Sequence, residues 1–186
     1  VDGLVLVDAA GWDSEGDAAD RPLAFRLLDN AIARRVLQDL ELGPIIRASM
    51  TKAYADQSFV TDDLVRRYSD LTRAPGHREA LLELFVDHEA SASNEVLSSL
   101  SMPVLIMWGD RDGVIPVANA DRFHTAIPGS DLRIYKNVGH QPQEEASEQS
   151  ARDIALFING LKQGRFENGV AVMTVQNTPA TMRQVE

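Results

Sequence analysis

The chain has 186 residues, of which 44% are hydrophobic and 25% are charged, a composition typical of a globular protein and not of a disordered one. Its formal net charge of −10 argues against a nucleic-acid partner, because phosphate binding requires clustered Lys and Arg side chains. The absence of cysteine excludes disulfides, cysteine-ligated zinc and a cysteine nucleophile, and it is compatible with a reducing compartment such as the cytoplasm, which we take as the expected location.

The first apolar run, Leu4–Val7, predicts a β-strand buried on both faces of a parallel sheet. Val1 is not an initiator methionine and the chain enters this run almost at once, so we expect the sequence to begin within a fold. All apolar runs are of strand length, well short of the roughly 20 residues that a membrane span requires, and no signal peptide is visible. Residues 1–13 are therefore assigned to a core strand and its loop.

Residues 14–99 show helical periodicity throughout and no convincing strand. One predicted helix opens near Asp20, a second is capped by Thr61, and a third runs from about Arg78 to His88. A helical insertion of this length is typical of a cap or lid, because ordinary connections in compact α/β folds are short. We expect this cap to shape a pocket for a small substrate.

Residues 100–161 predict a strand, a helix, a second strand and a final helix. These elements are expected at Val104–Trp108, Val117–Ile127, Leu132–Tyr135 and Glu144–Leu161. The fold class is therefore α/β, with three strands of a mostly parallel sheet, of which the first two should be central and the third nearer an edge. Residues 162–186 have little periodicity and are predicted to be a flexible tail.

Two polar residues follow neighbouring strands of this predicted sheet. Asp112 comes after the second strand and His140 after the third, so both should emerge at the carboxyl edge of the sheet. An imidazole can take the proton of a nucleophilic hydroxyl, and a carboxylate can orient that imidazole and stabilise its charge. By itself Asp112 is also typical of an Asp-Gly turn, and His140 of a loop. Their order and spacing favour a catalytic pair.

The segments that carry these residues resemble the α/β-hydrolase family. Trp108–Pro116 is similar to that family's acid loop, Gly-x-x-Asp-x-x-x-Pro, with Asp112 at the acid position. Asn137–Glu145 is similar to its catalytic-histidine loop, Gly-His-x-Pro followed by an acidic residue. In that family the acid precedes the histidine and both follow the nucleophile. Asp110 is the competing acid, but only Asp112 has the required spacing from the flanking glycine and proline.

The resemblance covers about residues 1 to 160 and implies the C-terminal portion of a serine hydrolase with a helical cap. Asp8 follows the first strand, where some branches of the family place the acid; with Asp112 present, we expect Asp8 to have a turn or pocket-edge role. No Gly-x-Ser-x-Gly motif occurs, so the nucleophile and the oxyanion-hole amides are expected upstream. The other histidines should be solvated or packed, without metal-site spacing: His77, His88 and His124.

We therefore expect a fragment of an α/β-fold hydrolase acting on a small, largely apolar ester, acyl or carbon–carbon substrate, inactive by itself. An aspartate nucleophile would instead imply epoxide or carbon–halogen hydrolysis. An acyltransferase or perhydrolase on the same fold, or a non-catalytic ligand-binding protein, are the alternatives. The mechanism requires no metal or organic cofactor, and nothing in the sequence indicates an oligomeric state. Because the first strand would have an unpaired edge, we expect the isolated chain to be unstable or prone to aggregation.

Overall fold

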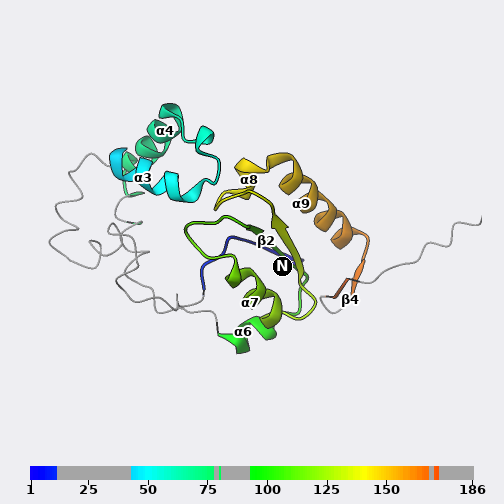
Figure 1. Ribbon diagram of the computed structural model, residues 1–186. Helices are drawn as coiled ribbons and strands as arrows, with labels where there is room; N and C mark the ends of the chain where they lie inside the picture. Colours follow the sequence, from blue (N-terminus) through cyan, green and yellow to red (C-terminus); the bar gives the residue numbers. More distant parts are fainter. Residues whose placement is uncertain (12–42, 78–79, 81–92, 168–169, 172–186) are drawn as a thin grey trace, which may run out of the picture.

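A computed structural model describes residues 1–11, 43–77, 80, 93–167 and 170–171, and the structure below is that of these residues. A parallel sheet lies between helices that cover its two faces (Figure 1). The described elements, in chain order, are β1 Leu4–Val7, α3 Gly43–Ala53, the 3-10 helix η1 Gln57–Phe59, α4 Asp62–Arg73, α6 Asn94–Ser98, β2 Val104–Gly109, α7 Ala118–Ala126, β3 Asp131–Tyr135, α8 Pro142–Glu145, α9 Ser147–Lys162, β4 Phe166–Glu167 and β5 Val170–Ala171.

The three predicted strands form one parallel sheet in the order β1-β2-β3, which confirms the predicted α/β fold class. β2 is buried along its whole length because it has a strand on either side and helices on both faces. β1, which we expected to be central, pairs only with β2 among the described residues and is half-buried, with Val7 37% exposed. In this part of the chain β1 is therefore an edge strand.

Alternate side chains of β2 enter two separate apolar cores, as the two-residue period of a strand requires. Ile106 and Trp108 pack on one face with Phe123 of α7. Leu105 and Met107 pack on the opposite face, where Phe157 of α9 covers them. The central strand thus holds the two helical layers together, and its carboxyl end lies in a fixed position between them.

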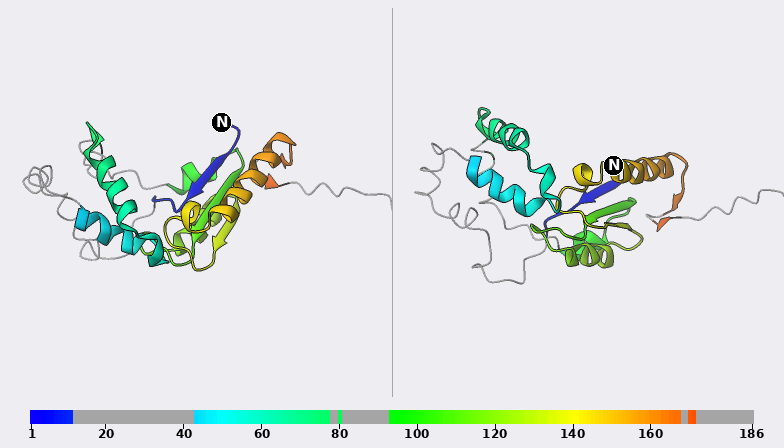
Figure 2. Two further views of the ribbon diagram at one scale, coloured as in Figure 1. Left: turned by 90° about the horizontal axis from the view of Figure 1, so that it is seen from above. Right: turned by 45° about the horizontal axis from the view of Figure 1, so that its top comes forward.

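Within the predicted cap, residues 14–99, the structure describes α3, η1, α4 and α6. Thr61 caps α4 as predicted, since its side chain accepts a hydrogen bond from the Leu64 N–H (3.2 Å). A third apolar cluster joins α3 to α4 through Met50 and Val65. These two helices lie beyond the carboxyl ends of the strands (Figure 2). The predicted helix near Asp20 lies outside the described residues, as does the one over 78–88 apart from residue 80.

The predicted helix over Glu144–Leu161 is two helices, α8 and α9. The helix is interrupted at Ala146, whose backbone (φ −127°, ψ 44°) is not helical. The break allows α9 to pack along the sheet while the acidic side chains of α8 point towards the end of α3. None of the described helices is both long enough and apolar enough to cross a membrane.

The segment predicted to be a flexible tail, 162–186, begins with ordered structure. β4 and β5 form a short antiparallel pair, and the Phe166 ring packs edge-on against Phe157 of α9, with 5.6 Å between ring centroids. Residues 172–186 lie outside the described part of the chain.

Replacing Ile106 by alanine tests the central position of β2. Ile106 is fully buried, so Ile106→Ala removes apolar contacts and leaves a cavity; we expect it to lower the free energy of unfolding by about 2–5 kcal/mol. Urea-induced unfolding of the intact protein measures this. Leu156→Ala is the control, because Leu156 is 60% exposed on α9 and its loss should change stability by less than about 0.5 kcal/mol. Equal effects of the two substitutions would contradict this packing.

Candidate active site

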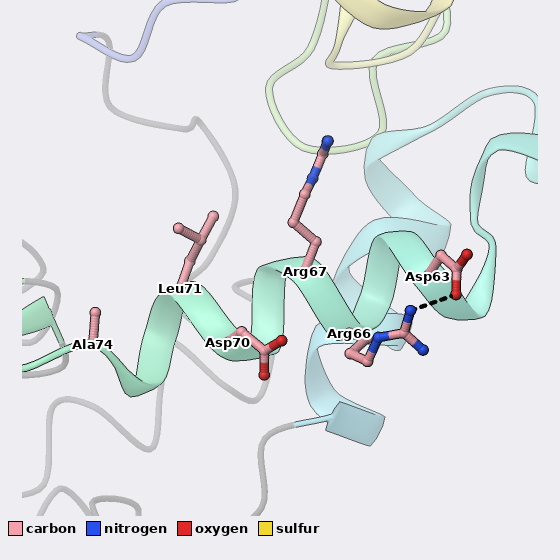
Figure 3. A pocket seen from close by; sticks show the side chains of 6 residues that line it. All are labelled: Asp63, Arg66, Arg67, Asp70, Leu71 and Ala74. Atoms are coloured by element: carbon pink, nitrogen blue, oxygen red, sulfur yellow. Dashed lines mark hydrogen bonds and ion pairs between the residues drawn. The ribbon is translucent and has the colours of Figure 1, made fainter.

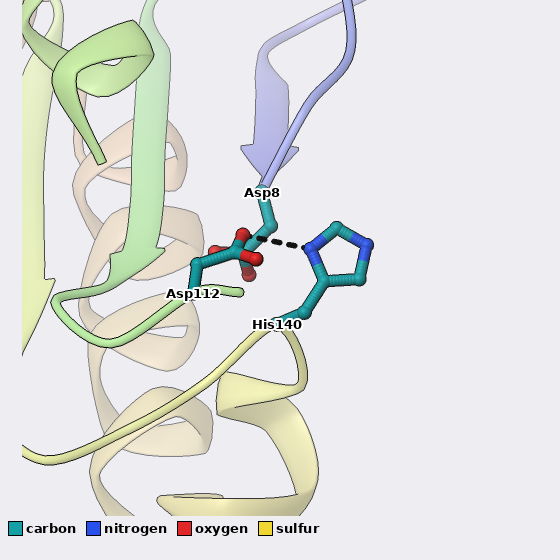
Figure 4. Close-up of side chains that lie close together, drawn as sticks. All are labelled: Asp8, Asp112 and His140. Carbon is teal, nitrogen blue, oxygen red and sulfur yellow. Dashed lines mark hydrogen bonds and ion pairs between the residues drawn. The ribbon is translucent and has the colours of Figure 1, made fainter. Parts of the chain in front are cut away.

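Three polar side chains gather at the carboxyl edge of the sheet, one after each strand (Figure 4). Asp8 follows β1, Asp112 follows β2 and His140 follows β3. One carboxylate oxygen of each aspartate and one ring nitrogen of His140 lie within 4.8 Å of one another. The three side chains lie close together because the three parallel strands end at the same edge of the sheet.

Asp112 and His140 form a hydrogen bond of 2.8 Å between Nδ1 of the imidazole and Oδ2 of the carboxylate. The other oxygen, Oδ1, accepts hydrogen bonds from the backbone N–H groups of Val114 (2.7 Å) and Ile115 (2.9 Å). The Asp112 side chain is 0% exposed, whereas that of His140 is 23% exposed. The carboxylate is thus held rigidly within the protein while part of the imidazole still faces outwards.

The environment of His140 favours its charged form. Burial of the ring by itself lowers the His140 pKa, but the hydrogen bond from His140 to Asp112 and the negative charge of Asp112 raise it, and the pKa lies above its usual value. With Nδ1 donating to Asp112, the neutral ring has its lone pair on Nε2. Nε2 points away from both carboxylates, and no described residue makes a hydrogen bond to it (Figure 4).

The loop that carries His140 approaches the end of β2 so closely that residue 109 must be glycine. A Cβ at Gly109 would lie 1.9 Å from the Gly139 carbonyl oxygen and 2.4 Å from that of Val138. A hydrogen bond of 2.9 Å from the Arg111 N–H to the Val138 carbonyl joins the same two loops. The acid loop and the histidine loop therefore form one backbone unit.

The histidine loop also contacts the end of α3, which belongs to the predicted cap. The His140 N–H donates to the Ala53 carbonyl at 2.6 Å. Glu145 of α8 accepts from the Gly139 N–H through Oε1 (2.8 Å) and from the N–H groups of Ala55 and Asp56 through Oε2 (2.8 and 3.0 Å). The sequence pattern indicated only that an acidic residue follows the histidine, so it did not predict this bridging role.

Glu144, the neighbour of Glu145, binds the cap through tyrosine hydroxyls. The Tyr54 hydroxyl donates to Oε2 of Glu144 at 2.7 Å, and the Tyr68 hydroxyl lies 3.5 Å from Oε1. Burial, followed by the hydrogen bond to Glu144, raises the pKa of Tyr54 above its ordinary range, so the hydroxyl keeps its proton and remains a donor. The two adjacent glutamates thus attach the described cap helices to the histidine loop.

Asp8 lies in a bend directly after β1, and the residue is buried. The residue is 4% exposed and has a positive φ of 43°. Its Oδ1 accepts a hydrogen bond from the Gly109 N–H at 3.0 Å, and its buried Oδ2 has no hydrogen-bond partner. Burial raises the pKa of Asp8 to about 7; the Gly109 N–H and the His140 charge lower it in part, and Asp112 raises it further.

Asp110, the competing acid, has a different role. Its Oδ1 accepts from the Asn137 N–H at 2.6 Å, and Oδ2 lies 3.3 Å from the Lys136 ammonium, so Asp110 holds the turn after β3. Of the two aspartates, Asp112 is the one that contacts His140. The remaining histidines lie elsewhere: His77 is exposed, Nδ1 of His124 is 2.9 Å from the Ser130 hydroxyl, and His88 lies outside the described residues.

Asp8, Asp112 and His140 are also the described residues that are close enough together to share a metal ion. A cation bound by Nδ1 of His140 would replace the existing hydrogen bond to Asp112, so we interpret the cluster as a hydrogen-bonded one. A separate surface hollow lies along α4 (Figure 3). It is lined by Asp63, Arg66, Arg67, Asp70, Leu71 and Ala74 and includes none of the three clustered residues.

Known proteins resemble this chain in sequence over part of their length. A lipase 3 from Moraxella sp. is 30% identical over 83 residues, covering 45% of this chain and 26% of the lipase. The acetyltransferase component of an acetoin cleaving system from Pseudomonas putida is 26% identical over 164 residues, covering 84% of this chain and 43% of that protein. The chain thus spans about a quarter to two fifths of these relatives. No family model matches the sequence.

Solved structures decide the fold. A meta-cleavage product hydrolase from Pseudomonas fluorescens IP01 superposes with a TM-score of 0.67 at 23% identity, over 85% of this chain and 56% of that one. MGS-M2, an α/β-hydrolase enzyme from a deep-sea metagenome library, superposes with a TM-score of 0.61 at 14% identity, over 88% and 56% of the two chains. The chain has the α/β-hydrolase fold. The fold that the resemblance of its two loops implied is confirmed.

Glu145→Ala tests the bridge between the end of α3 and the histidine loop. The substitution leaves the N–H groups of Ala55, Asp56 and Gly139 without their acceptor, so we expect the unfolding free energy to fall by about 1–3 kcal/mol. Hydrogen exchange at these three amides should accelerate. Glu148→Ala, at an exposed position of α9, should change stability by less than about 0.5 kcal/mol. Unchanged exchange in Glu145→Ala would show that the bridge does not form.

Proposed function

We propose that this chain supplies the base and the acid of a hydrolase triad, with His140 as base, Asp112 as acid and the nucleophile outside the present sequence. The hydrogen bond between Nδ1 of His140 and Oδ2 of Asp112 carries the proposal, because it leaves Nε2 as the proton acceptor. The partly exposed imidazole is accessible to a nucleophile, whereas the enclosed carboxylate is not. The Gly-x-Ser-x-Gly motif is absent from the sequence, so the attacking hydroxyl is contributed by another segment.

In this mechanism Nε2 of His140 accepts the proton of the nucleophile as that residue attacks the substrate carbonyl. The imidazolium that forms is stabilised by the Asp112 carboxylate, whose other oxygen is held by two backbone N–H groups. His140 then returns the proton to the leaving group. In the second half-reaction it takes a proton from water, which hydrolyses the acyl intermediate. The oxyanion-hole amides, like the nucleophile, come from outside this sequence.

The substrate class follows from the relatives and from the cap. The names of the similar proteins include a lipase and a meta-cleavage product hydrolase, which favours a small, largely apolar ester, acyl or carbon–carbon substrate. The helices α3 and α4 lie beyond the strand ends, on the side where Asp112 and His140 emerge (Figure 2). In this proposal α3 and α4 belong to a cap over the substrate, which is a small molecule.

Substitution of the proposed pair tests the function in a protein that contains this chain together with its nucleophile. We expect Asp112→Asn to lower kcat on a short-chain p-nitrophenyl ester by about 10⁴-fold, because the asparagine amide cannot hold the productive tautomer of His140. His140→Gln should lower it by at least as much, because the base is lost.

Two matched substitutions are the controls for this test. Asp110→Asn and His124→Gln change the same residue types at positions that do not contact the Asp112–His140 pair. Both should retain kcat within about threefold, an effect of less than 1 kcal/mol. Full activity in His140→Gln would refute the proposal. Loss of activity in Asp110→Asn with activity kept in Asp112→Asn would reassign the acid.

The coding sequence upstream of Val1 tests the origin of the nucleophile. We expect an in-frame strand followed by Gly-x-Ser-x-Gly roughly 20 to 30 residues before Val1, since this motif follows a neighbouring strand of the fold. Aspartate in place of that serine would change the proposed reaction to epoxide or carbon–halogen hydrolysis. A stop codon close upstream of Val1 would contradict a nucleophile on the same polypeptide.

A further inference from the structure

The Asp8 carboxyl group lies beside the proposed pair but has no part in the mechanism above. Asp8 is only 4% exposed, and its Oδ2 has no hydrogen-bond partner. A buried polar atom without a partner is costly, and a buried unpaired charge is more so. In Figure 4 the carboxyl group of Asp8 is next to that of Asp112. The burial of an aspartate at this position therefore requires a physical explanation.

Two buried carboxyl groups this close do not both ionise, because their charges repel each other in a poorly solvated site. The donors around them decide which one carries the proton. Asp112 accepts three hydrogen bonds, from two backbone amides and from His140. Asp8 accepts one, from the Gly109 N–H. The proton belongs on Asp8, and Oδ2 is the oxygen left to carry it.

We propose that Asp8 is a positioning residue that is protonated on Oδ2 and donates a hydrogen bond to the Asp112 carboxylate. This inference rests on the proposed function, because its effect on catalysis acts through the Asp112–His140 pair. The added donor helps to fix the orientation of the Asp112 carboxylate that contacts His140. It also supplies the partner that Oδ2 otherwise lacks. Asp8 itself does not contact the substrate.

The titration of Asp8 agrees with this assignment. The pKa of Asp8 is raised from 3.8 to about 7: burial is the largest cause, the Gly109 N–H opposes it, and the charge of Asp112 adds to it. The titratable groups that interact with Asp8 are Asp112 after β2, His140 after β3 and Tyr135 at the end of β3. Once Asp8 ionises, the hydrogen bond to Asp112 breaks and a second negative charge acts on His140.

The direction of the stability change follows from this raised pKa. The folded protein binds the Asp8 proton more tightly than the unfolded chain does, so the stabilisation is complete below pH 3.8. It is lost progressively as the pH rises through about 7. The raised pKa of His140 contributes in the same direction, so the part due to Asp8 must be separated by substitution.

Asp8→Asn makes this separation, because asparagine resembles the neutral aspartic acid. Its oxygen can still accept from the Gly109 N–H, its amide can donate to Asp112, and asparagine tolerates the positive φ of 43°. Asp8→Ala removes the donor. Asp121→Asn, on α7, controls for the loss of one negative charge elsewhere.

Nuclear magnetic resonance spectroscopy on the intact protein tests the proposal directly. In the wild type we expect the Asp8 carboxyl carbon to titrate near pH 7, about three pH units above an ordinary aspartate. At pH 5 the downfield Nδ1 proton of His140 should keep its shift in Asp8→Asn and Asp121→Asn and should move in Asp8→Ala. The fall in stability between pH 5 and 8 should be smaller in Asp8→Asn than in the wild type.

An Asp8 carboxyl that titrates near pH 4 would overturn the inference, as would equal displacement of the His140 Nδ1 proton in Asp8→Asn and Asp8→Ala. Neither of these two measurements depends on catalytic turnover. An active His140→Gln variant would refute the proposed function and would leave the Asp8 titration unaffected, so the two failures are distinguishable. If Asp8→Ala does not fold, the wild-type carboxyl titration still decides the matter.

Discussion

The site depends on the close backbone approach between the end of β2 and the loop after β3. Gly109 has no side chain to separate the two segments, and the Arg111 N–H joins them through the Val138 carbonyl. Hydrogen bonds weaken steeply with distance and angle, so the 2.8 Å contact between Asp112 and His140 requires loops that cannot drift apart. Packing of β2 between two helical layers fixes the position of one side of this contact.

The other side of the contact is fixed by α3, which belongs to the predicted cap. Glu145 accepts hydrogen bonds from the histidine loop through one oxygen and from the two residues Ala55 and Asp56 after α3 through the other. The Ala53 carbonyl accepts directly from the His140 N–H. The backbone of the proposed base is therefore attached to α3 by one direct hydrogen bond and by the Glu145 bridge.

The two aspartates at this sheet edge have different surroundings. Asp112 accepts hydrogen bonds from two loop amides and from His140, whereas Asp8 accepts one, from the Gly109 N–H. The pKa of Asp8 is raised to about 7, chiefly by burial. In our proposals the two groups have separate roles: Asp112 orients His140, and Asp8 donates to Asp112.

The sequence by itself determined the strands, because short apolar runs such as Val104–Trp108 have no stable alternative to burial in a sheet. It also indicated the α/β-hydrolase fold and the choice of Asp112 as the partner of His140. Only the tertiary structure decided the break at Ala146, the burial of Asp8 and the bridge made by Glu145. These features depend on contacts between residues far apart in the chain, 90 positions for Ala55 and Glu145, and local periodicity carries no information about such pairs.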